Sequence, residues 1–319
     1  MIRRVRHLTA AVLVAFGASL ALAGGAGATF PGRDGAIVFA RSYDLYLITP
    51  GGHVIKRLTR TPKIDEMQPS WSADGRRMAF SRRSFVNENH PGPVEIWVMN
   101  ADGSRKHRIA IGADPAWSPD GRWIAYASLF RPLGTGSSAI WVIHPDGTDR
   151  HRLTFNRSHT YGSPDWSPNG RLVAYVDNFG GQPIDGVPGP KTRAVYTMHP
   201  DGHGKKRLTP LGSLTDSPSW SPDGKGIAFL RSVPPATPPV SFKETVWTMR
   251  ADGSHERQLS DQPALSCAWA PAGDRVVMSV DVAGPGDIFT VRIDGSALTN
   301  LTKSSANDVD PAWRPSRGR

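Results

Sequence analysis

A phrase built around tryptophan recurs six times along the chain, at intervals of 44 to 54 residues. Its tryptophans are Trp71, Trp117, Trp166, Trp220, Trp269 and Trp313. The phrase is plainest at 115–122, Pro-Ala-Trp-Ser-Pro-Asp-Gly-Arg, and at 218–225, Pro-Ser-Trp-Ser-Pro-Asp-Gly-Lys. A repeat of this length corresponds to one supersecondary unit copied in tandem, so the fold has to be deduced unit by unit.

Each repeat contains short apolar runs separated by turn residues. In the unit that follows Trp117, the runs and the turn between them stand at 124–126, 140–143, 146–147 and 152–154. The runs are rich in β-branched and aromatic side chains and are bounded by Gly, Pro and Asp, which is typical of strands. We therefore predict four strands per repeat, and no helix of useful length beyond the N-terminal segment.

The aspartates of the repeat stand where the backbone has to reverse. In Ser118-Pro119-Asp120-Gly121, proline presets φ at the second turn position and aspartate suits the third. Glycine then takes the positive φ of a type I turn followed by a bulge. A calcium site or a catalytic acid pair is the alternative use of such aspartates. Because the residue recurs at the same turn in successive repeats, we favour the structural interpretation.

Tandem antiparallel units of this length are typical of a β-propeller. The N-terminal unit has three good strands, at 35–39, 45–48 and 57–59, whereas the C-terminal end supplies a spare one at 310–315. Pairing of that last strand with the first unit would close the ring and remove exposed sheet edges. The sequence thus predicts an all-β fold, a six-bladed β-propeller of four-stranded antiparallel blades, with the first blade closed by the C-terminal strand. The repeated tryptophans are expected to pack between neighbouring blades.

The N-terminal segment has the order of a secretory signal peptide. Three arginines within the first six residues precede an apolar stretch from 8 to 23, and a small-residue Ala-Gly-Ala site follows at 26–28. We expect cleavage after Ala28, which makes residues 1–28 the signal peptide and residues 29–319 a single propeller domain. The mature protein is expected to be periplasmic or secreted and monomeric. No later segment has the roughly 18 apolar residues of a membrane span, so none is expected.

The chain carries a formal net charge of +10, which falls to +7 without the three arginines of the signal peptide. Much of the basic surplus stands at repeat positions, so it is spread around the ring. Nucleic-acid binding needs a basic face with stacking aromatics, and an exported protein does not meet intracellular nucleic acid. We therefore expect no nucleic-acid partner. The single cysteine, Cys267, is predicted to be a small buried residue.

A four-stranded meander gives the disc two different faces. The first and third turns lie on one face, and the second loops and the connectors between blades lie on the other. The turns are short and alike, whereas the second loops differ in length and sequence, as at 81–94, 127–138 and 176–193. Loops released from a repeat are where binding residues concentrate. We therefore expect the variable-loop face to bind the partner.

Candidate binding residues on that face come from the loops and from the connectors that lead into the innermost strands. They are Arg82, Arg83, His90, Arg131 and Asp177 from the loops, and Glu66, Asp114, His159, Tyr161, Asp216 and Asp310 from the connectors. The acidic groups among them are expected to ring the mouth of the central channel, where crowded carboxylates bind a cation or a basic segment. The alternative is that Asp114 and Asp310 brace the start of a strand beside its proline.

No local motif in the sequence points to catalysis. Among the ten histidines, His144 and His199 occupy the same place before a Pro-Asp-Gly turn, and no pair has the spacing of a His-Glu-x-x-His metal site. A Gly-x-Ser-x-Gly elbow and a phosphate-binding glycine loop are also missing. We predict no catalytic residue and no cofactor, and we leave open a divalent cation in the channel mouth.

The phrase at 114–126, followed by Ile-Trp-Val at 140–142 and Arg-Leu-Thr at 152–154, resembles the TolB-type propeller repeat, also called the WD40-like or PD40 repeat. The resemblance extends over residues 30–315. It implies a six-bladed propeller in an exported protein that engages other proteins, as TolB does in the Tol–Pal envelope system. The α/β domain of TolB has no counterpart between the signal peptide and the first blade, so the resemblance implies the propeller and not the pathway.

Two functions are consistent with these observations. The first is a periplasmic or secreted, non-catalytic scaffold that binds an envelope or extracellular protein, or a glycan, through the variable-loop face. The second is a metal-assisted hydrolase or lyase acting on sugars or lactones, with the metal held at the channel mouth by the acidic connectors and His159. Metal analysis of the purified protein distinguishes the two.

Overall fold

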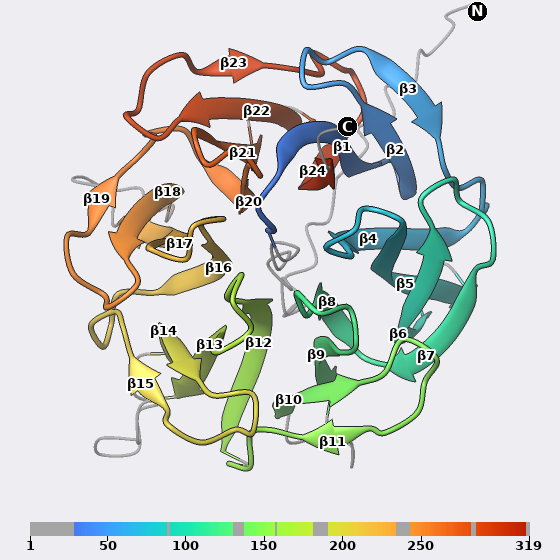
Figure 1. Ribbon diagram of the computed structural model, residues 1–319. Helices are drawn as coiled ribbons and strands as arrows, with labels where there is room; N and C mark the ends of the chain where they lie inside the picture. The colour runs from blue at the N-terminus through green and yellow to red at the C-terminus, as the bar shows by residue number, and fades with distance from the viewer. Residues whose placement is uncertain are drawn as a thin grey trace, which may run out of the picture.

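The computed structural model describes residues 29–87, 90–129, 137–156, 158–180, 191–233, 243–281 and 285–316. These residues form six four-stranded antiparallel sheets, and none of them is helical. The sheets are arranged radially as the blades of a closed disc (Figure 1). The prediction of an all-β, six-bladed propeller is confirmed.

The strands are numbered in chain order, and each blade runs from an innermost strand at the channel to an outermost strand at the rim. In that order, blade 1 comprises β24 (Asp308–Ser316), β1 (Arg33–Arg41), β2 (Asp44–Ile48) and β3 (Val54–Arg57), and blade 2 comprises β4 (Ile64–Trp71), β5 (Arg77–Asn87), β6 (His90–Asn100) and β7 (His107–Ile111). Blade 3 comprises β8 (Ala113–Trp117), β9 (Ile124–Leu129), β10 (Ser138–Ile143) and β11 (His151–Arg152), and blade 4 comprises β12 (His159–Trp166), β13 (Val173–Gly180), β14 (Lys191–Met198) and β15 (Lys206–Arg207). Blade 5 comprises β16 (Thr215–Trp220), β17 (Gly226–Val233), β18 (Lys243–Arg250) and β19 (Arg257–Gln258), and blade 6 comprises β20 (Ala264–Trp269), β21 (Arg275–Val280), β22 (Asp287–Arg292) and β23 (Thr299–Asn300).

The ring closes by pairing the two ends of the chain. Strand β24, red in Figure 1, lies antiparallel to the blue strand β1, with Ile37 opposite Trp313 and Val38 opposite Ala312. The C-terminal strand is therefore the innermost strand of blade 1, as the sequence predicted. Closure leaves no blade without its neighbours and removes the sheet edges on which another chain would pair.

The repeated tryptophans fill the space between neighbouring blades. Trp71, Trp117 and Trp220 are at most 1 % exposed. Trp71 belongs to a core cluster with Leu45 of blade 1, and Trp220 to a cluster with Val195 of blade 4, so each indole packs on the preceding blade. Large aromatic side chains bury the most apolar area per residue, and this explains why the phrase keeps tryptophan. The predicted inter-blade position is confirmed.

The Asp-Gly turns have the predicted positive φ at glycine and are held by side-chain hydrogen bonds. Ser118 Oγ donates to Asp120 Oδ1 at 2.5 Å, and the same carboxylate oxygen accepts the amide of Arg122 at 3.0 Å. Gly121 completes the turn with φ of +70°, a conformation that residues with a Cβ rarely adopt. The equivalent bonds recur at Ser221-Asp223. These aspartates therefore organise the turns.

The Arg-Leu-Thr phrase also has a structural role. Leu208 is buried, and Thr209 Oγ1 accepts the amide of Val195 at 2.9 Å, which satisfies a donor of β14 just beyond the residues that pair with β15. The same bond is made by Thr59, Thr154 and Thr302. The threonine of the phrase thus completes the hydrogen bonding of the third strand in blades 1, 3, 4 and 6.

The meander order assigns every connection to one of two faces. The constant-turn face holds the turns between the third and fourth strands of each blade and, in blades 2 to 6, the turns between the first and second strands. The variable-loop face holds the loops between the second and third strands and the connectors between blades, at 58–63, 112, 153–158, 208–214, 259–263 and 301–307. The part of the chain that the structure describes contains no helix with the length and apolar character needed to cross a membrane.

Candidate functional site

The innermost strands share an unusual backbone feature close to the variable-loop face. In five of the six strands, the residue three places before the tryptophan has φ between 48° and 54°. These residues are Gln68, Asp114, Ser163, Ser217 and Asp310. A positive φ is uncommon for residues with a Cβ, and register shifts at these points in β4, β8, β12 and β16 mark β-bulges.

The bulges place polar groups where they bond the next blade. The amide of Gln68 donates to Asp310 Oδ2 at 3.1 Å, and Gln68 Oε1 accepts the amide of Asp114 at 3.2 Å. Asp114 Oδ2 in turn accepts the amide of Ser163 at 3.2 Å, and Ser163 Oγ donates to Asp216 Oδ1 at 3.1 Å. A chain of hydrogen bonds thus runs through blades 1 to 5. These contacts support the interpretation of Asp114 and Asp310 as braces.

The metal hypothesis receives no support from this arrangement. The described residues contain no group of three or more His, Cys, Asp or Glu side chains that could hold a metal ion. Burial raises the pKa of Asp310 to about 6, although the amide of Gln68 opposes the rise. A divalent cation at the channel mouth therefore remains a prediction that these contacts do not test.

His159 and Asp177 were predicted separately, and the structure brings them together in blade 4. His159 Nδ1 lies 2.7 Å from Asp177 Oδ1, and its ring stacks between Tyr161 at 5.7 Å and Phe179 at 5.1 Å. Burial raises the pKa of the Asp177 carboxyl, and the bond to His159 lowers it in part. The stack and the hydrogen bond hold the imidazole in one orientation. The arrangement presents a fixed polar and aromatic edge at the end of β12.

Asp216 is bonded to an arginine that bridges two blades. Arg193, on β14, donates to Asp216 Oδ2 at 2.6 Å and also to Glu244 on β18. Burial raises the pKa of Asp216, and the charge of Arg193 opposes the rise. Arg193 also stood in a variable loop of the sequence, but its pairing across blades requires the register of two sheets. The bridge fixes the edges of blades 4 and 5 relative to each other.

Blade 2 pairs its arginines with acidic residues on the adjacent innermost strand. Arg83 donates to Asp65 at 2.8 Å, and Arg82 Nε lies 3.9 Å from Glu66 Oε1. The guanidinium of Arg82 also stands 4.3 Å from the ring centroid of Trp97. Burial raises the pKa of the Glu66 carboxyl. The predicted residues of this blade are therefore neighbours, joined by ion pairs.

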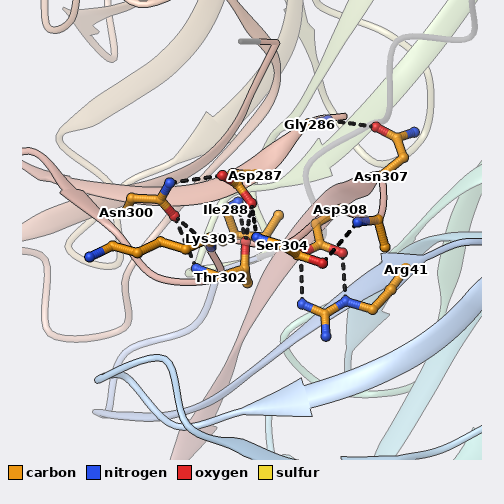
Figure 2. A network of polar contacts seen from close by, with 11 residues as sticks. Arg41, Gly286, Asp287, Ile288, Asn300, Thr302, Lys303, Ser304, Asn307 and Asp308 are labelled. Atoms are coloured by element: carbon orange, nitrogen blue, oxygen red, sulfur yellow. Dashed lines mark hydrogen bonds and ion pairs between the residues drawn. The ribbon is translucent and has the colours of Figure 1, made fainter. Parts of the chain in front are cut away.

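The seam between blades 6 and 1 carries the network drawn in Figure 2. Arg41 donates two hydrogen bonds of 2.7 Å to Asp308, whose side chain is fully buried. Asp287 accepts the hydroxyl of Thr302 at 3.0 Å and the amide of Ser304 at 2.9 Å. These bonds fix the connector that leads into β24. The variable-loop face is thus held in place where the two chain ends meet.

Two predicted residues fall where the structure gives no placement. The side chain of His90 and the whole of Arg131 lie outside the described residues. The sequence also missed the most exposed apolar side chains on this face, Tyr43 and Phe155 at 66 % and Leu211 at 54 %. Tyr43 stands in the loop between β1 and β2, and the other two stand in connectors. Only their position in irregular segments could have drawn attention to them.

A shallow cleft opens beside Tyr43 on the variable-loop face. It measures about 300 Å³ and is lined by Ser42, Tyr43, Asp44, Arg57, Arg60, Thr61, Pro62 and Lys63. Its lining combines one exposed aromatic ring with three basic side chains, of which Arg57 is paired with Asp44. Two further clefts lie on the constant-turn face, one beside Trp123 and one beside Trp269. Concave surface is therefore present on both faces.

Comparison with known proteins relates the chain to the TolB propeller family. The family model described as the TolB beta propeller domain matches residues 81–263. The chain is 27 % identical over 288 residues to the Tol-Pal system protein TolB of Francisella tularensis subsp. mediasiatica, covering 87 % of this chain and 60 % of that protein. A shorter match, 29 % identical over 123 residues, relates it to the Tol-Pal system protein TolB of Anaeromyxobacter dehalogenans and covers 38 % of this chain and 27 % of that protein.

A solved structure gives the same fold. The crystal structure of TolB from Acinetobacter baumannii superposes with a TM-score of 0.69 at 21 % sequence identity, covering 90 % of this chain and 68 % of that one. At this identity the likeness concerns the fold alone. The chain spans less than two thirds of the length of the two curated relatives.

Proposed function

Because the chain belongs to the TolB β-propeller family, we propose that it is an exported, non-catalytic scaffold that binds a protein through its variable-loop face. The relatives are described as proteins of the Tol-Pal system. A protein of the cell envelope or the extracellular space is therefore the first partner class. The N-terminal segment at 1–28 supports export, since it has the order of a signal peptide.

The observation that carries the proposal is the exposure of large apolar side chains on the variable-loop face. Tyr43, Phe155 and Leu211 project from three different blades of the variable-loop face. Aromatic residues and arginine are enriched at protein interfaces, and the guanidinium of Arg152 lies 5.2 Å from the ring centroid of Phe155. Anchors that are already held in place lose little conformational entropy on binding.

The basic lining of the cleft beside Tyr43 favours a negatively charged ligand. Arg60 and Lys63 line it together with the exposed phenol ring of Tyr43. A segment that inserts an apolar side chain and carries a carboxylate nearby matches this lining in both respects. A glycan is the second ligand class, because an exposed aromatic ring is also a surface for sugar stacking. Protease treatment of the captured material distinguishes the two classes.

The experiment compares two sets of three substitutions that each replace exposed apolar side chains with aspartate. The test variant carries Tyr43→Asp, Phe155→Asp and Leu211→Asp on the variable-loop face. The control variant carries Val54→Asp, Ile55→Asp and Leu298→Asp, which replace exposed residues on the side of the constant turns. Each purified protein is immobilised and exposed to envelope and secreted fractions of its own source, after circular dichroism has confirmed the native fold.

The proposal predicts a partner that is retained by the wild type and by the control variant and lost from the test variant. Loss from the control variant alone would place the binding surface on the opposite face. Equal retention by all three proteins would remove the variable-loop face from consideration.

A further inference from the structure

The described chain begins inside the ring. Thr29 and Phe30 precede β1 and are only 3 % and 2 % exposed. The blue start of the chain lies near the centre of the disc in Figure 1. Neither residue belongs to the tryptophan repeat. The central channel is thus filled, at least in part, by a segment that no repeat accounts for.

This segment contacts blades that are not neighbours in the ring. Phe30 shares a core cluster with Ala116 and Trp117 of blade 3. Thr29 Oγ1, in contrast, donates to the carbonyl oxygen of Trp269 in blade 6 at 3.0 Å and lies 3.5 Å from Ser219 Oγ in blade 5. The two residues therefore span the channel. Their hydrogen bonds and apolar contacts fix the direction in which the chain enters β1.

A buried carboxylate with one oxygen unpaired in the described part of the chain lies on β12, the innermost strand of blade 4. Asp165, just before Trp166, is fully buried, and its Oδ2 accepts the amide of Trp220 at 2.7 Å. Its Oδ1 has no hydrogen-bond partner within the described residues. Burial raises the pKa of this carboxyl well above the ordinary value. A buried carboxylate with a free oxygen is costly unless a donor or a positive charge compensates it.

The position of Asp165 is otherwise occupied by small residues. The residues before the other five tryptophans are Ser70, Ala116, Ser219, Ala268 and Ala312. Asp165 is thus the one carboxylate at this place in the repeat. At this position Ser70 and Ser219 accept the amides of Trp117 and Trp269 with a hydroxyl oxygen. Accepting the amide of the next blade therefore does not by itself require a carboxylate at position 165.

Thr29 and Asp165 are brought to the same inner strand, β16. Asp165 bonds the amide of Trp220, and Ser219, the preceding residue, lies beside the Thr29 hydroxyl. Ser219 also accepts the amide of Trp269 at 3.1 Å, so the two bonds form successive steps of one inter-blade ladder. The Thr29 hydroxyl and the Asp165 carboxylate therefore contact consecutive residues of β16, Ser219 and Trp220.

We infer that the channel is a binding site for the mature amino terminus of this same chain, with Asp165 as the partner of the α-ammonium group of Thr29. Removal of residues 1–28 by signal peptidase would create that ammonium group. The uncleaved precursor has a neutral peptide nitrogen at Thr29 and cannot supply the charge. Processing would thus stabilise the propeller by pairing two charges that are each unfavourable when buried alone.

The test uses two forms of the protein that differ only at the amino terminus. One begins at Thr29, released from a fusion by a protease that leaves no extra residue, and the other keeps Gly27 and Ala28. Each form is made in the wild-type background, with Asp165→Asn, and with Asp310→Asn as the matched control at another carboxylate that accepts an inter-blade amide. Thermal unfolding is followed by circular dichroism.

The inference predicts that the form beginning at Thr29 melts higher by on the order of 5 °C in the wild-type and Asp310→Asn backgrounds. With Asp165→Asn the two forms should melt alike. An equal difference in all three backgrounds, or no difference in the wild type, would overturn the pairing.

A second measurement does not depend on any variant folding. An N-terminal threonine is a 1,2-amino alcohol, which periodate cleaves selectively. In the folded protein that begins at Thr29, oxidation should be slower by about tenfold or more than in the urea-unfolded chain, because the group reacts only when the segment leaves the channel. Equal rates would show that the mature terminus is outside the ring and would overturn the inference. Neither readout involves a binding partner, so failure here leaves the proposed scaffold function to its own test.

Discussion

The two faces of the disc use the same residue, aspartate, in opposite ways. On the constant-turn face, a hydroxyl two residues further along and the backbone amide beside it donate to each carboxylate, and these bonds lower its pKa. This holds for Asp102, Asp146, Asp252 and Asp294. These groups are surrounded by water and serve only their own turn.

Toward the variable-loop face and the channel, burial raises the pKa instead. This is the case for Asp177, Asp216 and Asp310. Their oxygens bond a histidine, an arginine or the backbone of another strand, so they connect elements that are distant in sequence. The comparison shows that the exposed carboxylates of the turns hold the local backbone, whereas the buried carboxylates make tertiary contacts.

The largest loss of stability is expected from a substitution in the core between two blades, which supports both faces of the disc. Trp220→Ala should lower the free energy of unfolding by about 3–5 kcal/mol, because it leaves a cavity between blades 4 and 5. Urea titration measures the change. Trp141→Ala is the matched control, since that indole is half-buried and covered by Arg150 at 4.2 Å. Equal costs for the two substitutions would contradict the assignment of the repeated tryptophans to the core.

A smaller effect is expected for the bridge on the variable-loop face. Arg193→Ala should cost about 2–3 kcal/mol, because Asp216 and Glu244 lose the charge that compensates them. Arg108→Ala removes the exposed pair with Glu95 and should cost less than about 1 kcal/mol. If the two arginine variants unfold at the same urea concentration, the buried and exposed pairs do not differ as described.

The pH dependence of stability should have opposite signs for the two kinds of carboxyl. The pKa of Asp310 is raised from 3.8 to about 6 in the folded state, so its contribution is fully present below pH 3.8 and is lost as the pH rises through 6. Between these values the wild type should lose roughly 2 kcal/mol more stability than Asp310→Asn. For Asp252, whose pKa is lowered, the contribution is present above pH 3.8 and disappears on acidification. Urea titrations at several pH values measure both, and a common sign would contradict the contrast.

The smallest effect is expected at a single constant turn. Asp223→Ala removes the acceptor of the Ser221 hydroxyl and the Lys225 amide and should cost about 1 kcal/mol. Asp223→Asn keeps an acceptor oxygen and should cost less, as measured by the shift in melting temperature. A loss of partner binding in Asp223→Ala would show that this turn contributes to the binding surface and does not serve the local backbone alone.

The fold could be predicted from the sequence because the same turn and strand residues recur in each repeat. Pro, Asp and Gly define each turn, and Trp marks each innermost strand, so errors at one blade are corrected by the others. The turns and strands depend on neighbours within a few residues. Ring closure was predictable because one spare strand, around Trp313, was left over at the C-terminus.

The candidate site was less accessible to sequence reasoning. The contact between His159 and Asp177 depends on the register of β12 with β13, and the bridge from Arg193 depends on two blades. The exposure of Tyr43 and Phe155 is decided by what does not cover them. Thr29 and Asp165 meet the same strand only because the ring closes. Such relations come from tertiary packing and leave no periodic pattern.

The most direct test of a propeller divided into a structural face and a recognition face is site-specific photo-crosslinking in the native envelope. A photoreactive amino acid replaces Tyr43, Phe155 or Leu211 in one set of proteins and Val54, Ile55 or Leu298 in another, and crosslinked partners are identified by mass spectrometry. We predict a shared partner from the first set and none from the second. A partner that crosslinks only from the constant-turn side would contradict the division between the two faces.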